Sequence, residues 1–385
     1  MNEEKRRIER EKITEEAVVL SMNNAHTLLQ LATGTGKSKI ALDCIAVSPS
    51  RQKWLLVCEE TSHIDNWMRE IEKWNLQKWW DENFMDAICY ASLKHWNGIN
   101  VNLLLDEVHN AGSFLRTENL SGIFFEQIIS LSATVNDEIK EKLNVICPFV
   151  ELSVSLSEAI QRGILPEPKI YVVDVELDEK FKDYEFKFGK KIAKLTAREY
   201  YAQLSKTATY WKDKYEEESL PWQKNKMMMS LLNRKRWLGV YKTPIISALV
   251  DKIRGHKFIC FCSSVAQAKQ LGGKRAVNSK NSKEVNQQII SSFNEGKADE
   301  IFSCQMLRES VTLEGIEIGI VGQLDSETLS INQMGGRILR SDNPIVFITV
   351  IKGTQDEKYL NRFLEEMDSK YITRITKNQI KELKI

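Results

Sequence analysis

The pattern that most constrains the fold is an alternation of short apolar runs with amphipathic stretches. In the first part of the chain the apolar runs read as buried strands. These runs cover residues 27–32, 53–58, 100–107 and 127–134. Amphipathic segments with helical spacing, such as 38–47 and 64–74, lie between them. Near-continuous apolar strands that alternate with helices are typical of a doubly wound parallel sheet whose two faces are both covered.

The same alternation returns nearer the C-terminus and predicts a second α/β lobe. Its apolar runs are residues 257–264, 300–307, 316–324 and 344–352. The stretch between the two series, residues 178–241, lacks β-branched runs and is rich in Lys, Glu, Ala, Met and aromatic residues, so it reads as helical. We therefore expect a first lobe over 1–168, a mainly helical basic insertion over 169–243, and a second lobe with C-terminal helices over 244–385.

The distribution of charge sets the insertion apart from the two lobes. The chain of 385 residues has a net charge of +1, but residues 180–242 hold sixteen Lys and Arg against seven Asp and Glu. A basic middle flanked by mildly acidic ends is typical of a module that contacts a polyanion.

Bulk features indicate a protein of the cytoplasm. No apolar run approaches the roughly 20 residues that a membrane-spanning helix needs. The charged N-terminus MNEEKRRIEREK is not followed by the apolar run of a signal peptide. The seven cysteines are scattered without the spacing of metal ligands, which indicates reduced thiols. We therefore expect no membrane association and a cytoplasmic location.

The strongest local motif, Leu31-Ala-Thr-Gly-Thr-Gly-Lys-Ser38, follows an apolar run and opens an amphipathic helix. Glycines in such a loop let backbone N–H groups turn toward a phosphate, and the N-terminus of the helix adds a favourable dipole. Lys37 is expected to reach the β- and γ-phosphates of ATP, and the Ser38 hydroxyl to ligate Mg²⁺. The predicted nucleotide-binding residues are Thr33, Gly34, Thr35, Gly36, Lys37 and Ser38.

A second motif, Asp106-Glu-Val-His109, ends another apolar run. Adjacent carboxylates at a strand end suit two roles in phosphoryl transfer, in which Asp106 holds the Mg²⁺ shell and Glu107 polarises the attacking water. Ser132-Ala-Thr134 follows a later apolar run. Its hydroxyls are expected to sense the two carboxylates and relay their state to the other lobe.

In this order the three motifs resemble motifs I, II and III of superfamily 2 helicases of the DEAH-box-like type, whose lobes are RecA-like. Residues 59–67 are similar to motif Ia and the helix after it in Swi/Snf-type and phage DNA translocases. Residues 90–94 resemble the short motif that precedes the DEAH box in those proteins. Residues 156–166 resemble the lobe exit of type I and type III restriction motors and their phage relatives.

The second lobe continues the resemblance. Residues 261–268 are similar to motif IV, and residues 333–340, QMGGRILR, resemble motif VI. The resemblance implies that Arg337 and Arg340 act as arginine fingers on the γ-phosphate, with Gln333 in the same motif. A guanidinium suits this role because it presents a bidentate fork and keeps its proton.

Motif V can be read in two registers. The EGIE sequence at 314–317 looks superficially like the family motif, but Glu309 with Ser310 keeps the family's spacing to motif VI. The second register also leaves the apolar run 316–324 free to form the next strand. We therefore assign Glu309 to the nucleotide site.

The resemblance implies an ATP-dependent DNA helicase of superfamily 2 that moves along, unwinds or remodels single-stranded, forked or duplex DNA in phage replication, recombination or repair. The cytoplasm would then be that of the bacterial host, and other replication or repair proteins are further candidate partners. Three alternatives stay open: a duplex-DNA translocase without processive unwinding, an RNA helicase, and a nucleic-acid-binding scaffold that has lost catalysis. Candidate contacts to the nucleic-acid backbone are Thr61, Ser62, Ser92, Lys94, Ser263 and Gln305.

Two aromatic features have both a structural and a nucleic-acid interpretation. The cluster over residues 74–84 is expected to be a satellite core rather than a base-stacking surface. In the insertion, cations and aromatic residues are interleaved between 190 and 237, which suits phosphate contact with stacking as well as a solvated helical face. The methionines of 227–229 are expected to serve packing rather than a ligand site.

Overall fold

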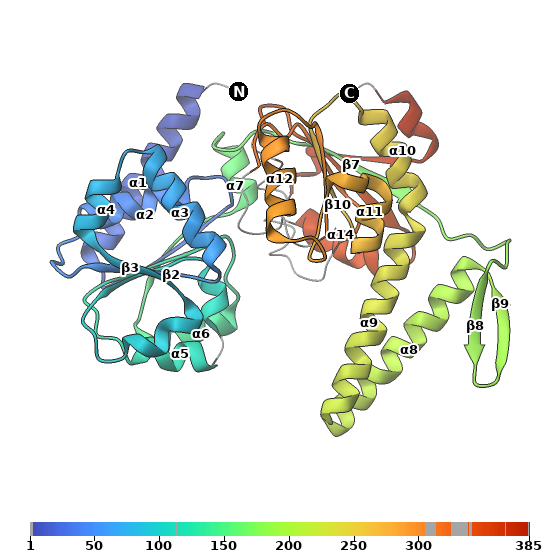
Figure 1. The fold of residues 1–385 in the computed structure, drawn as a ribbon, viewed down its shortest axis with the longest axis horizontal. Coiled ribbons are helices and arrows are strands. Elements are labelled where there is room, and N and C mark those ends of the chain that lie inside the picture. The colour runs from blue at the N-terminus through green and yellow to red at the C-terminus, as the bar shows by residue number, and fades with distance from the viewer. Residues whose placement is uncertain are drawn as a thin grey trace.

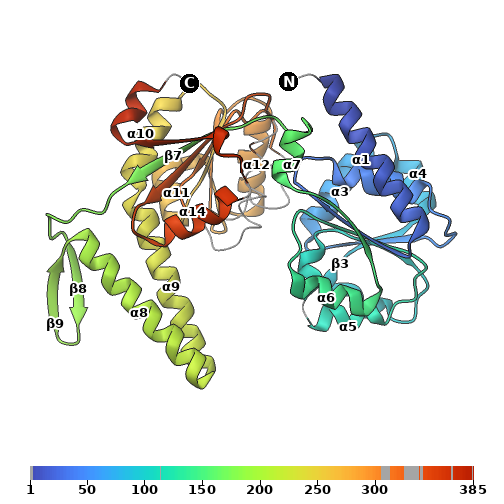
Figure 2. The same ribbon diagram turned by 180° about the vertical axis from the view of Figure 1, so that it is seen from behind.

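The computed structural model describes residues 3–112, 114–304, 313–324, 338, 341–365, 367–383 and 385. Two α/β lobes lie side by side, and an arm of helices extends from the second lobe (Figure 1). The short helix α7, Leu156–Gln161, lies between the lobes in both ribbon views (Figures 1 and 2). The expected α/β class, with two parallel-sheet lobes and a mainly helical insertion, is confirmed.

The first lobe is built on a six-stranded parallel sheet with the strand order β3-β2-β4-β5-β1-β6. Its strands are β1 His26–Leu31, β2 Trp54–Cys58, β3 Phe84–Cys89, β4 Asn102–Leu105, β5 Ile128–Ser132 and β6 Val150–Val154. The four central apolar runs of the sequence form β1, β2, β4 and β5. The sequence does not predict β3 and β6, because these edge strands bury only some of their residues and contain no apolar run.

Helices cover both faces of this first sheet (Figures 1 and 2). One face has α1 Glu3–Asn23, α2 Lys37–Ala46, α3 Thr61–Lys73 and α4 Gln77–Asn83, and the other has α5 Phe114–Ser121 and α6 Asp137–Ile146. The buried ring of Trp80 stacks on Phe84 with centroids 3.7 Å apart. The expected satellite core at residues 74–84 is therefore confirmed.

The second lobe has a seven-stranded sheet, again all parallel, with the order β11-β12-β10-β13-β14-β7-β15. Its strands are β7 Lys169–Val175, β10 Phe258–Phe261, β11 Ala276–Val277, β12 Glu300–Ser303, β13 Ile318–Val321, β14 Ile345–Ile351 and β15 Ile372–Thr376. Its helices are α10 Thr243–Ile253, α11 Val265–Gly272, α12 Lys283–Asn294 and α14 Gln355–Glu365. The strands β10, β12, β13 and β14 correspond to the four predicted apolar runs.

Strand β7 corrects the predicted boundary of the insertion. Residues 169–175, which the sequence assigns to the insertion, pair in parallel with β14 on one side and β15 on the other. The pairing joins segments that are far apart in the sequence, so local composition does not reveal it. The region outside the sheet therefore begins after Val175, and the C-terminal segment adds the strand β15 as well as helices.

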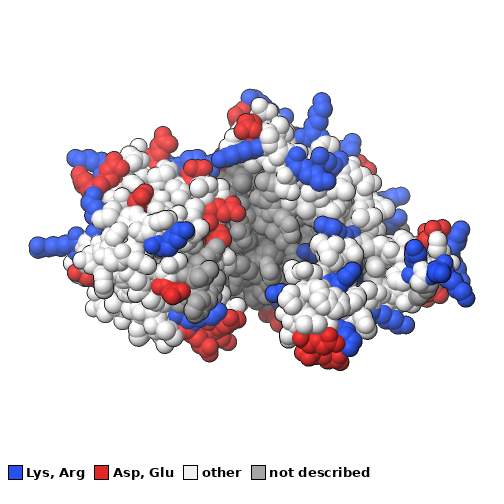
Figure 3. Space-filling model, turned by 60° about the horizontal axis from the view of Figure 1, so that its bottom comes forward, with Lys and Arg blue, Asp and Glu red and all other residues white. Residues whose placement is uncertain are grey.

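The insertion forms the arm. A hairpin of β8 Tyr184–Phe188 and β9 Lys191–Leu195 precedes two long helices, α8 Ala197–Glu218 and α9 Pro221–Tyr241, which pack on each other. Seen from below, Lys and Arg gather at the hairpin end and acidic side chains at the tip of the arm (Figure 3). Met228 and Met229 of α9 are 56% and 54% exposed, and they line a pocket together with Gln355 and Tyr359 of α14. These two methionines therefore do not belong to the buried core.

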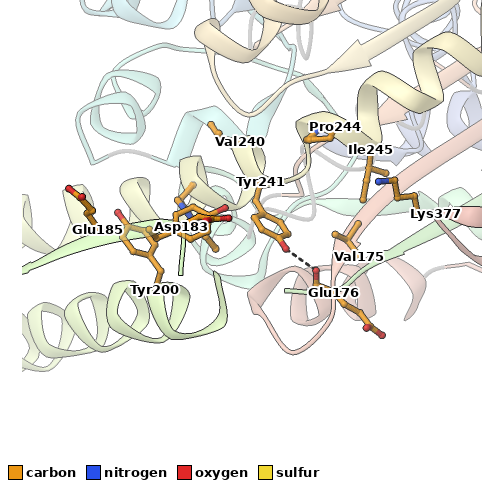
Figure 4. A pocket seen from close by; sticks show the side chains of 12 residues that line it. Val175, Glu176, Asp183, Glu185, Tyr200, Val240, Tyr241, Pro244, Ile245 and Lys377 are labelled. Carbon is orange, nitrogen blue, oxygen red and sulfur yellow. Dashed lines mark hydrogen bonds between the residues drawn. The ribbon is translucent and has the colours of Figure 1, made fainter. Parts of the chain in front are cut away.

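Aromatic residues fix the base of the arm. The ring of Trp237 lies 5.3 Å from Tyr184, 5.4 Å from Tyr200 and 5.4 Å from Tyr241, measured between centroids. Figure 4 shows the pocket of about 650 Å³ that these residues line, where the Tyr241 hydroxyl donates to the Glu176 carbonyl at 3.1 Å. The interleaved aromatic residues at the base thus pack on one another, because each half-buried ring needs an apolar partner.

Two further observations concern the cysteine thiols and the length and polarity of the helices. Cys44, Cys58, Cys260 and Cys262 are buried and form no disulfide. Among the described residues, no helix combines the length and the apolar character needed to cross a bilayer.

Candidate nucleotide and nucleic-acid site

The phosphate-loop motif connects β1 to α2 in a tight turn. Gly34 and Gly36 have φ angles of 91° and 101°, which favour glycine because other residues are strained there. The Thr35 hydroxyl donates to the Ala32 carbonyl at 2.8 Å, and the Ala32 N–H donates to the Val154 carbonyl at 3.0 Å. A side-chain carbon placed at Gly36 would meet no atom within 4 Å, so the loop surrounds open space.

Two buried polar atoms of this loop are left without a hydrogen-bond partner among the described residues. They are the Nζ of Lys37 and the Oγ1 of Thr33. Buried polar atoms in proteins almost always have partners, so an orphaned ammonium indicates that something else binds there. Lys37 is also the first residue of α2, where free backbone N–H groups favour an anion. The loop therefore fits the phosphates of a nucleotide.

The paired carboxylates follow β4. One carboxylate oxygen of Asp106, Oδ2, accepts a hydrogen bond from the Trp67 indole at 2.8 Å, and the other, Oδ1, accepts from the Glu107 N–H at 3.0 Å. Glu107 has a φ of 46°, a strained conformation for a residue with a side chain. The Oε2 of Glu107 is buried without a hydrogen-bond partner among the described residues. Strain and an orphaned acceptor are features of functional sites.

The electrostatics of Asp106 suit a cation site. Burial raises the pKa of the Asp106 carboxyl above its ordinary value, and the neighbouring charge of Glu107 raises it further. The Trp67 hydrogen bond and the charges of Lys37 and His63 lower the pKa of Asp106 and so act in the opposite direction. A divalent cation would offset the repulsion between the two carboxylates, so the pair fits Mg²⁺.

His109 lies between Glu107 and the Ser-Ala-Thr motif after β5. The Ser132 hydroxyl donates to the Thr134 carbonyl at 2.8 Å, and His109 Nδ1 lies 3.0 Å from the same Ser132 oxygen. Because Ser132 gives its hydrogen to Thr134, His109 donates to Ser132. His109 Nδ1 is also 3.4 Å from Oε2 of Glu107. The contacts place His109 between Glu107 and the Ser-Ala-Thr segment, and the expected relay through these hydroxyls stays a prediction.

The candidate residues of the first lobe lie along one edge of its sheet. All six strands are parallel, so the loops at their carboxyl ends share that edge. The strand order gives the order of these loops along the edge. Ser92 and Lys94 follow β3, Thr61 and Ser62 follow β2, and Asp106 and Glu107 follow β4. The hydroxyls of Ser132 and Thr134 come next after β5, and the phosphate loop comes after β1. Predicted nucleic-acid contacts therefore lie on one side of the carboxylates and predicted nucleotide contacts on the other.

The nucleic-acid candidates differ in exposure. Thr61 and Lys94 are exposed, whereas Ser62 and Ser92 are half-buried. In the second lobe, the Ser263 hydroxyl donates to Gln267 at 2.9 Å and lies against the arm helix α9. Five further predicted site residues lie outside the described residues: Gln305, Glu309, Gln333, Arg337 and Arg340.

Two contacts at the site are not evident from sequence motifs. Arg10 of α1 donates to the Gly34 carbonyl of the phosphate loop at 3.0 Å. Trp67 of α3 is 3% exposed and hydrogen-bonded to Asp106. Neither residue belongs to the phosphate-loop or carboxylate motif. The only sequence signal is the resemblance of residues 59–67 to motif Ia and its helix, which does not indicate a contact with the carboxylate.

Comparison with known proteins agrees with the fold. Residues 241–342 match the helicase conserved C-terminal domain. The structure is similar to *S. cerevisiae* Dbp5 bound to RNA and ADP BeF3, with a TM-score of 0.64 and 12% identity over 96% of this chain and 91% of that one. No curated protein sequence matches the chain significantly.

Two further structures are similar. The *Pyrococcus furiosus* Hef helicase domain has a TM-score of 0.52 and 14% identity, over 92% of this chain and 97% of that one. The ATP-dependent Type ISP restriction-modification enzyme LlaBIII, bound to DNA, has a TM-score of 0.57 and 12% identity, over 95% of this chain and 31% of that one. The chain therefore shares the two-lobed α/β fold of these helicase structures, and its second lobe holds the match to the helicase conserved C-terminal domain.

Proposed function

We propose that the protein is a nucleic-acid-stimulated ATPase that uses ATP and Mg²⁺ to move along, unwind or remodel DNA. The observation that supports this most is the orphaned Lys37 ammonium at the edge of the sheet that also holds Asp106 and Glu107. An unpartnered buried cation beside two carboxylates suits a metal-bound triphosphate better than any ligand that is neutral.

The residues of the first lobe divide the chemistry between them. Lys37 and the N–H groups at the start of α2 bind the β- and γ-phosphates. Ser38 and Asp106 hold Mg²⁺, which supplies positive charge between the phosphates when it is bound. Glu107 orients and polarises the attacking water, and its carboxylate oxygen Oε2 is buried without a hydrogen-bond partner among the described residues.

The second lobe completes this proposed site. Arg337 and Arg340 stabilise the charge that grows on the γ-phosphate, with Gln333 and Glu309 beside them. Because these groups come from the other lobe, closure of the two lobes on the nucleotide and reopening after hydrolysis become the source of movement.

DNA is the proposed substrate on the strength of residues 59–67 and 156–166, which resemble those of DNA motors. Thr61, Ser62, Ser92, Lys94, Ser263 and Gln305 are the proposed backbone contacts. Contacts of this kind are independent of base sequence and weaken steeply with salt. A role in phage replication, recombination or repair is part of the same proposal.

The test is ATP hydrolysis measured with single-stranded DNA, duplex DNA, forked DNA and single-stranded RNA, together with a strand-displacement assay on the fork. We expect DNA to stimulate turnover and the fork to be unwound. Stimulation by duplex DNA without displacement would identify a duplex translocase instead, and stimulation by RNA alone an RNA helicase. No turnover with any substrate would refute the ATPase assignment and favour a binding scaffold.

A further inference from the structure

The indole of Trp67 is buried against the predicted metal ligand. Its Nε1–H donates to Oδ2 of Asp106 at 2.8 Å, and its side chain is 3% exposed. The other oxygen of the same carboxylate accepts from the backbone of Glu107. Each oxygen therefore has one protein donor, and together the two donors fix the plane of the carboxylate while leaving lone pairs for a metal ion or its waters.

The helix that holds Trp67 begins at the predicted nucleic-acid contacts. Helix α3 starts at Thr61, next to Ser62, just after the carboxyl end of β2. Strand β2 pairs with β4, the strand that ends at Asp106. The buried face of α3 consists of His63, Trp67 and Ile71, at the four-residue spacing of one helix side. One rigid element thus has nucleic-acid candidates at its end and a donor to the metal ligand on its buried side.

We propose that Trp67 is a positioning residue through which nucleic-acid contact at the start of α3 controls how Asp106 holds Mg²⁺. The proposal rests on the function proposed above. A shift of α3 on binding DNA moves the indole N–H, and because this N–H fixes one carboxylate oxygen, the shift reorients Asp106 toward or away from the metal. The reverse also follows, so Mg²⁺-nucleotide binding changes the affinity of the α3 N-terminus for DNA.

Packing alone is the competing explanation, and a matched pair of variants separates the two. Trp67→Phe keeps an aromatic ring but removes the N–H donor. Trp80→Phe is the control, because Trp80 is also buried in the first lobe but stacks on Phe84. If Trp67→Phe fails to fold, benzothienylalanine at position 67 replaces the N–H by sulfur and preserves the shape of the ring.

The measurement is the Mg²⁺ concentration for half-maximal binding of a fluorescent ADP analogue, with and without saturating single-stranded DNA. Without DNA, the Trp67 variant is expected to need about tenfold more Mg²⁺ than the wild type or Trp80→Phe, as other losses of metal-ligand support do. DNA is expected to shift the requirement in the wild type and in Trp80→Phe but not in the Trp67 variant. Equal behaviour of all three proteins would overturn the proposal.

The two proposals fail in distinguishable ways. If DNA changes neither the Mg²⁺ requirement nor ATP turnover of the wild type, the proposed function is wrong and the coupling through α3 falls with it. If DNA stimulates turnover and shifts the Mg²⁺ requirement by the same factor in the wild type and the Trp67 variant, the function stands but coupling bypasses Trp67.

Discussion

His26, the first residue of β1, is a buried titratable group away from the proposed chemistry. Its Nδ1 donates to the Cys147 carbonyl at 2.9 Å, and its Nε2 accepts from the Ser130 hydroxyl at 2.8 Å. Burial lowers the pKa of His26 from 6.5 to about 4. The Nδ1 donation persists in the charged ring, but the Nε2 atom can accept from Ser130 only when the ring is neutral, and burial disfavours the charge, so protonation of His26 opposes folding of the first lobe.

The lowered pKa predicts a specific acid sensitivity. Above pH 6.5 His26 is neutral in the folded and the unfolded chain. In that range the free energy of unfolding therefore does not change with pH on account of His26. As the pH falls from 6.5 to about 4, the unfolded chain takes up a proton that the folded chain refuses, and the free energy of unfolding drops by about 3 kcal/mol. His26→Asn should remove this loss in denaturant titrations at pH 7 and pH 5.

The exposed His95 provides the control for this prediction. His95→Asn should leave the pH dependence of stability as it is in the wild type. An unchanged pH dependence in His26→Asn would show that another group is responsible.

At the residue scale, sequence motifs predict those site residues that lie close together in one segment of the chain. The phosphate loop and the Asp106-Glu107 pair are recognisable because glycines, a lysine or adjacent carboxylates follow an apolar run. The contacts of Arg10 with Gly34 and of Trp67 with Asp106 are tertiary, and nothing in the local sequence of α1 or α3 indicates them. Residues that support a site from another element therefore escape prediction from sequence.

Among the helices, the junction of α9 and α10 is tied to α14 by a buried ion pair. Lys242 Nζ lies 2.8 Å from Asp356, and both side chains are 0% exposed. Lys242 also donates to the Thr349 carbonyl at 3.2 Å, and Gln323 donates to Asp356 at 2.9 Å. Burial lowers the pKa of Lys242, and the charge of Asp356 opposes that effect. The pair fixes the arm to the second lobe.

Breaking this pair from one side should be costly. Lys242→Met leaves the carboxylate of Asp356 buried without its counter-ion, which is expected to lower the free energy of unfolding by about 3–5 kcal/mol. Adding Asp356→Asn removes the stranded charge and should restore a large part of the loss. Denaturant unfolding of the two variants measures both effects, and a double variant less stable than Lys242→Met would contradict the assignment.

Prediction of the elements succeeds where a strand is central and fails at the edges. Strands β1, β2, β4 and β5 are rich in apolar residues and almost entirely buried because helices cover both faces of the sheet. The edge strands β3 and β6 lack such runs. Strand β7 has an apolar sequence, but it pairs with β14, which is far from it in the sequence. The residues around β7 therefore do not indicate this pairing.

For the whole molecule, the repeated alternation of apolar and amphipathic segments predicts two lobes correctly. The arm is predicted as helical and basic, but its hairpin is not, since β8 and β9 pair only with each other and are largely exposed. The central claim is a statement at this scale: one nucleotide is bound by Lys37 of the first lobe and by Arg340 of the second.

ATP hydrolysis in the presence of single-stranded DNA tests that claim most directly, measured for the wild type, Lys37→Ala, Arg340→Ala and the control Lys39→Ala. Lys39 lies in the first turn of α2 and pairs with Asp43 on the surface, so its loss should leave turnover unchanged. Lys37→Ala and Arg340→Ala should each fold and each lose about 10³-fold in turnover, because each removes charge stabilisation from the γ-phosphate. Wild-type turnover in either of these two variants would contradict a nucleotide held between the lobes.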